Sequence, residues 1–72
     1  MKLPHVSGKE TARRLERAGF LFVRQIGSHL ILRGGDPPVT LSVPNHKDLK
    51  PGTLRNILRQ AGITVKRFGE LK

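Results

Sequence analysis

The chain has 72 residues, which allows one small domain near the lower limit for a self-supporting core. It has no cysteine, which excludes disulfides and thiolate metal sites, and its three histidines are too scattered for a structural zinc site. Its net charge of +9 predicts salt-dependent binding to nucleic acid, which we favour over an acidic membrane. No apolar run is long enough to span a bilayer, and the first residues lack a signal-peptide pattern, so we expect a cytoplasmic protein.

The first predicted helix covers residues 8–18. Ser7 and Glu10 have the spacing of a capping box, in which each side chain accepts a hydrogen bond from the other residue's backbone amide. Apolar residues recur on one side of this helix, and Gly19 ends it because glycine adopts the left-handed conformation without a steric penalty. The remaining surface is mostly basic, and we expect solvated side chains for Arg13, Arg14 and Arg17.

Three strands are predicted after this helix. Residues 20–26 are rich in aromatic and β-branched side chains, and Gly27-Ser28 has the composition of a two-residue hairpin turn. The returning strand covers residues 29–33. Residues 34–38 contain two glycines and two prolines and predict a loop. Alternating apolar and polar residues then predict a third strand over residues 39–43.

Two helices are predicted to complete the chain. Pro51 suits the first turn of a helix, and apolar residues at helical spacing continue it as far as Gly62. Thr64 is expected to cap a short terminal helix. This order predicts one α+β domain over residues 1–72, with a three-stranded antiparallel sheet and the helices on one face, as in double-stranded-RNA-binding domains. The apolar helix faces are needed for its core, so we expect no membrane partner.

The two-residue turn also predicts which strand residues share a face. Ile26 should pair with His29, and the pairing continues one residue at a time until Phe22 lies opposite Arg33. The face expected beneath the helices holds Leu21, Val23, Gln25, Leu30 and Leu32. The open face holds Phe22, Arg24, Ile26, His29, Ile31 and Arg33.

His29 is the candidate catalytic residue of this open face, with Arg24 diagonal to it and Arg33 further along. Arginines bind phosphate oxygens through charge-assisted hydrogen bonds, and an imidazole can exchange a proton with a ribose 2′-hydroxyl or a leaving oxygen. The set therefore fits phosphodiester chemistry. On spacing alone, a half-exposed histidine beside two solvated arginines is the more common arrangement. The apolar residues of the same face fit a stacked base or a partner protein.

Four segments of the chain resemble the HicA family of toxin–antitoxin systems. They are LERAGF at 15–20, RQIGSH at 24–29, VPNH at 43–46 and LKPGTLRNILRQAGI at 49–63. Each segment alone is a weak signal, but the combination is specific and extends over nearly the whole chain. Leu30 departs from the family, where a polar residue often follows the motif histidine, and the 34–38 loop is particular to this chain. The RNA sequence preference therefore does not transfer.

The resemblance implies a double-stranded-RNA-binding-like fold and cleavage of mRNA that arrests growth, without a metal or other cofactor. It makes His29 the catalytic residue, and it implies a HicB-type antitoxin that masks the site. With Arg24 and Arg33, we expect further RNA contacts from Ser28, Lys47 and Lys50.

Two points stay open at this stage. The complementary acid or base is water or His46, although we favour a structural role for His46 in its loop; His5 lies in a terminal segment and we expect no role for it. The alternatives to a ribonuclease are a non-catalytic RNA-binding module, which explains the charge and fold equally well, and a pure protein-interaction domain.

Overall fold

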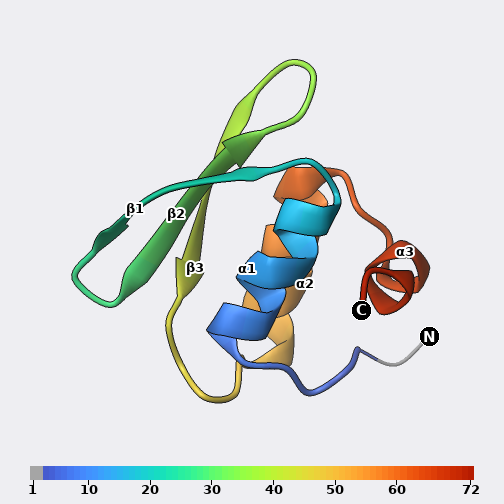
Figure 1. Ribbon diagram of the computed structural model, residues 1–72. Helices are drawn as coiled ribbons and strands as arrows, with labels where there is room; N and C mark the ends of the chain where they lie inside the picture. Colours follow the sequence, from blue (N-terminus) through green and yellow to red (C-terminus); the bar gives the residue numbers. More distant parts are fainter. Residues whose placement is uncertain (1–2) are drawn as a thin grey trace.

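A computed structural model describes residues 3–72, and Figure 1 shows their arrangement. The elements are α1 (Gly8–Arg17), β1 (Leu21–Ile26), β2 (His29–Gly34), β3 (Val39–Pro44), α2 (Pro51–Ala61) and α3 (Val65–Glu70). The strands form an antiparallel sheet in the order β1-β2-β3, and both α1 and α2 pack against it (Figure 1). This is the α+β architecture that the sequence predicts. No helix within residues 3–72 has the length and apolar composition needed to cross a membrane.

The two ends of α1 follow from local sequence. The Ser7 side chain accepts a hydrogen bond from the backbone amide of Glu10 at 3.0 Å, which is one half of the predicted capping box. Gly19 follows the helix with a φ of 105°, and the amide of Phe20 donates to the carbonyl of Leu15 at 3.0 Å. A glycine with positive φ ends α2 in the same way.

The carboxylate of Glu10 does not complete the capping box; it binds two arginines instead. Arg13 Nη2 and Arg14 Nε each lie 2.8 Å from Glu10 Oε2. The expectation that Arg14 is solvated is wrong, because this side chain is buried between α1 and α3. Its guanidinium lies 4.8 Å from the ring centroid of Phe68, where the negative face of the ring attracts a cation. Arg14 therefore stabilises the packing of α3 against α1.

The two arginines lower the pKa of Glu10 from 4.5 to about 2, the hydrogen bond from Arg13 being the largest cause and that from Arg14 the next. A carboxyl with a lower pKa in the folded state stabilises the fold above pH 4.5, and this contribution is lost as the pH falls toward 2. We expect Glu10→Gln to lower the free energy of unfolding at neutral pH, and to lower it much less near pH 2.

Urea denaturation at the two pH values measures this difference. Glu70→Gln is the control, because the Glu70 carboxylate lies 4.0 Å from Arg67 in an exposed pair that contributes little. An equal loss of stability for Glu10→Gln at both pH values would contradict the linkage.

The core lies between the two long helices and the inner face of β2 and β3. Leu30 and Leu32 of β2, and Leu41 and Val43 of β3, are buried on this face. Phe68 of α3 is also fully buried. Within residues 3–72, no helix lies on the other face of the sheet, so its side chains face solvent (Figure 1).

The register of the β1–β2 hairpin departs from the prediction beyond the third pair from the turn. A β-bulge at Val23 shifts the pairing by one residue. As a result Phe22 lies opposite Leu32 instead of Arg33, and Leu21 lies opposite Arg33. Paired residues share a face, so the bulge moves Leu21 to the open face and Phe22 to the helix side.

Every residue of β1 is exposed, which corrects the prediction that Leu21, Val23 and Gln25 lie beneath the helices. The helices cover β2 and β3, whereas β1 is an edge strand that they leave exposed, and its hairpin tip projects away from them (Figure 1). Alternation separates the two faces of a strand but does not show whether a helix covers either one. The exposed large apolar residues of β1, here called the apolar strip, are Leu21, Phe22, Val23 and Ile26.

Candidate active site and nucleic-acid interface

His29 is the first residue of β2, directly after the two-residue turn. Gly27 has a φ of 57°, which a two-residue hairpin turn of this type requires at its first position. In the sheet, His29 lies between Ile26 of β1 and Pro44 of β3. Its side chain is exposed on the open face, at the end of the sheet. This position leaves the imidazole accessible to a large substrate.

Arg24 lies on the same face as His29. It pairs with Ile31, which makes it the diagonal neighbour of His29 across the hairpin. Diagonal neighbours on one face of a sheet are about 7–8 Å apart, a separation that long side chains can close around one bound group. No carboxylate of residues 3–72 forms an ion pair with Arg24. Its guanidinium is therefore available to a phosphate beside His29.

Arg33 lies at the far end of β2. Four residues along a strand separate it from His29 by roughly 13 Å. Its Nη1 atom donates a hydrogen bond to the hydroxyl of Thr40 at 2.9 Å, on the open face. The structure therefore brings Arg24, but not Arg33, to the imidazole.

Two backbone hydrogen bonds join the hairpin turn to the exit of β3 and the start of α1. The amide of Asn45 donates to the carbonyl of Ser28 at 2.7 Å, one step beyond the pair formed by Pro44. The amide of Gly8 donates to the carbonyl of His46 at 2.8 Å. The loop after β3 is thus fixed against both neighbours.

Gly8 is required at this junction by packing. A Cβ atom at this position would overlap the carbonyl oxygen of Pro44 and lie 3.0 Å from the Cα of Asn45. Both obstacles are backbone atoms, which cannot rotate away. Only glycine allows α1 to begin this close to the exit of β3.

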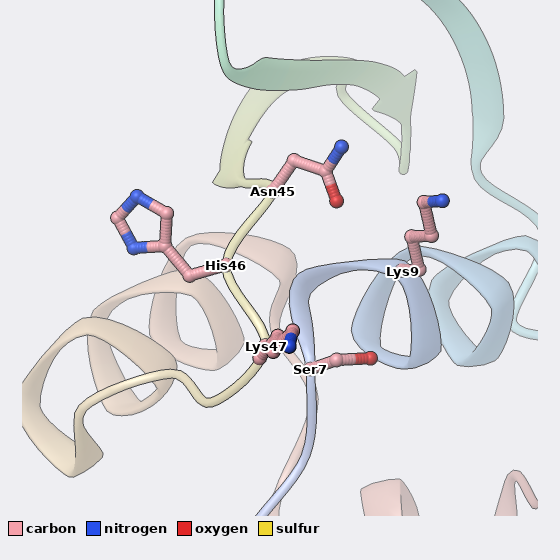
Figure 2. Close-up of a pocket in the computed structure, with 5 residues that line it drawn as sticks. All are labelled: Ser7, Lys9, Asn45, His46 and Lys47. Carbon is pink, nitrogen blue, oxygen red and sulfur yellow. The ribbon is translucent and has the colours of Figure 1, made fainter.

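A pocket of about 310 Å³ opens at this junction (Figure 2). Figure 2 shows Lys9 and Asn45 on one side of the loop after β3, with the ring of His46 on the other side. All the side chains that line the pocket are polar, and they come from two elements distant in sequence: Ser7, Lys9, Asn45, His46 and Lys47.

The predicted RNA contacts are only partly gathered around the imidazole. Ser28 adjoins it and is bonded to the loop that carries Lys47, whereas Lys50 is the N-cap of α2 and lies outside the residues that line the pocket. Sequence reasoning missed Lys9 and Asn45. The available signal for Lys9 was its place in the first turn of a helix, where the helix dipole disfavours a cation.

No group of three or more metal-ligating side chains occurs in the part of the chain that the structure describes. One acidic residue of α1 and one of the loop after β3 lie beside basic side chains. Glu10 binds Arg13 and Arg14, and the carboxylate of Asp48 lies 3.7 Å from the ring of His5. In the sheet, the direct neighbours of His29 are Ile26 and Pro44, and Arg24 lies diagonal to it.

The family model described as HicA toxin of bacterial toxin–antitoxin matches residues 8–63. This chain belongs to the HicA toxin family. The match runs from the start of α1 past the end of α2, and it includes His29, the hairpin turn and the loop after β3. The comparison with curated proteins gives no match. As a HicA family member the chain is a toxin, and membership implies an antitoxin partner.

Proposed function

We propose that this HicA toxin is an endoribonuclease that cleaves mRNA and arrests growth, with His29 as its catalytic residue and no metal cofactor. The observation that carries the proposal is an exposed imidazole at the open end of the sheet, with Arg24 as its diagonal neighbour. The Arg24 guanidinium forms no ion pair with any of residues 3–72. The net charge of +9 supports it, since such a field draws in a polyanion. Metal independence and the growth effect follow the family resemblance.

The proposed chemistry is an internal transesterification of RNA. The ribose 2′-oxygen attacks the adjacent phosphorus while the bond to the 5′-oxygen of the next nucleotide breaks. The products are a 2′,3′-cyclic phosphate and a free 5′-hydroxyl. His29 takes the 2′-hydroxyl proton or gives a proton to the leaving oxygen, and water or His46 performs the other transfer. Arg24 holds the non-bridging oxygens and stabilises the charge that grows on them in the transition state.

The test is an RNA cleavage assay with purified protein in the presence of EDTA. We expect cut RNA that carries 2′,3′-cyclic phosphate and 5′-hydroxyl ends. Loss of cleavage on adding EDTA would overturn metal independence. RNA that stays intact but bound, at every ratio of protein to RNA, would establish the alternative of a non-catalytic RNA-binding module.

We further propose that the antitoxin is of the HicB type and that it covers the apolar strip. As one of the two edge strands, β1 has backbone groups free to pair with an added strand, and the strip supplies exposed apolar contacts beside them. A second copy of the chain would bring another charge of +9 to this edge, so an acidic partner is favoured over self-association.

Replacement of Leu21 by serine is expected to weaken antitoxin binding about tenfold, because its exposed fraction of 72% leaves most of its apolar surface for a partner. Isothermal titration with the antitoxin measures the affinity. Thr40→Ser, on the exposed side of β3, is a control in which little apolar surface is lost. Unchanged affinity for Leu21→Ser would show that the partner binds elsewhere.

A further inference from the structure

The pocket at the start of α1 contains positive charge that its surroundings do not neutralise. Lys9 and Lys47 line it, and neither forms an ion pair with any of residues 3–72. A carboxylate follows each lysine in sequence, but Glu10 binds two arginines of α1, and Asp48 lies 3.7 Å from His5. Neither acid therefore forms an ion pair with Lys9 or Lys47.

Two neutral groups add hydrogen-bond donors to the pocket. The Ser7 oxygen accepts a bond from a backbone amide of α1, which leaves its hydroxyl proton free to donate. The Asn45 side chain forms no hydrogen bond with another of the described residues, so its NH₂ group can also donate. Within residues 3–72, every side chain that lines the pocket carries a polar group. This set suits an anion with several oxygens.

Lys9 occupies a position that helix stability alone does not favour. It lies in the first turn of α1, where the positive end of the helix dipole favours an acidic residue and disfavours a cation. A residue that opposes a local rule at the edge of a cavity is typical of a binding site. An anion in the pocket would offset the repulsion between Lys9 and the helix dipole.

The pocket adjoins the candidate active site. Asn45 is bonded through its amide to the carbonyl of Ser28, and the preceding residue, Pro44, pairs with His29 in the sheet. An RNA strand held at His29 and continuing off the end of the sheet therefore crosses the loop that forms one wall of the pocket.

We propose that this pocket binds a non-scissile phosphate of the same RNA strand that His29 cleaves. Lys9 and Lys47 supply the cations, and Ser7 and Asn45 supply neutral donors. The proposal rests on the proposed ribonuclease function for the identity of the ligand. An acidic side chain of the antitoxin is the less favoured occupant, since protein interfaces have an apolar centre and the exposed large apolar residues among 3–72 lie on β1.

The test measures RNA binding separately from cleavage. The probe is a single-stranded oligoribonucleotide with 2′-O-methyl riboses, which cannot form the cyclic phosphate, and fluorescence anisotropy gives Kd between about 50 and 200 mM NaCl. Lys9→Gln and Lys47→Gln are each expected to raise Kd about tenfold. Each should also reduce the slope of log Kd against log salt by about 0.7. Lys66→Gln, in α3, is the control with the same change of charge.

Cleavable RNA supplies the second readout. The two pocket variants should raise KM and leave kcat within about twofold, since Lys9 and Lys47 hold a phosphate that does not react. Values of Kd equal to that of Lys66→Gln would overturn the proposal. So would pocket variants that lose affinity for the antitoxin alone. Because the probe is uncleavable, a wild-type protein that binds it but never cuts RNA would refute the ribonuclease function while the pocket remains separately measurable.

Discussion

Replacing His29 by alanine is expected to lower RNA cleavage at least about 100-fold, the usual loss when a general acid or base is removed. Growth arrest on overexpression without the antitoxin should disappear with it. The circular dichroism spectrum should not change, because the His29 side chain is exposed and forms no hydrogen bond with another described residue. The measurement is the initial rate of cleavage of one RNA by both proteins at equal concentration.

His5→Ala is the matched control, since His5 is also an exposed histidine but lies outside the sheet. It should cleave at the wild-type rate. The arginines provide a second matched pair: Arg24→Gln should lower kcat/KM by about 100-fold, and Arg33→Gln by less than tenfold, because Arg33 lies roughly 13 Å from the imidazole along β2. Undiminished cleavage by His29→Ala would end the catalytic assignment.

Gly8→Ala is expected to destabilise the fold by about 3 kcal/mol, at the upper end of the usual cost of overpacking. The added methyl group meets the carbonyl of Pro44 and the Cα of Asn45, and the strain is relieved only if α1 moves away from the exit of β3. That movement would also stretch the hydrogen bond from the Gly8 amide to His46. A domain of this size has a total stability of roughly 4–10 kcal/mol, so the loss is a large share of it.

Gly52→Ala is the control for this substitution. Gly52 lies in the first turn of α2, and a Cβ there meets no atom within 4 Å. Alanine should leave stability unchanged or raise it by up to about 1 kcal/mol, because it restricts the unfolded chain. Chemical denaturation of the two variants gives both values. A Gly8→Ala variant as stable as Gly52→Ala would show that α1 can move away from the exit of β3 at little cost in free energy.

The sequence predicts the elements of this fold well because their ends are specified locally. Ser7 and Gly19 delimit α1, Pro51 and Gly62 delimit α2, and each observed strand begins and ends within one residue of its predicted range. The two-residue turn at Gly27 also fixes the first three pairs of the hairpin. These features depend on backbone conformations that a few neighbouring residues determine.

What the sequence did not predict depends on contacts between distant segments. The bulge at Val23 reverses which face of the sheet Leu21 and Phe22 occupy. No glycine or proline lies at this position to indicate a bulge in the sequence. Arg14 is an ordinary basic residue of an amphipathic helix until Phe68, which is 54 residues later, packs against it. The pocket also depends on contacts between distant segments, because Lys9 and Lys47 line one cavity only when α1 begins beside the exit of β3.

The pairing of Ile26 with His29 has a consequence for how the toxin can be silenced. Ile26 belongs to the apolar strip, and His29 lies directly opposite it on the same face. A partner that lies over this end of the strip therefore occupies the space above the imidazole. Inhibition would then be competitive, and activity would return only as the partner dissociates or is degraded. One interface would both cover the apolar strip and set the fraction of toxin molecules able to cut RNA.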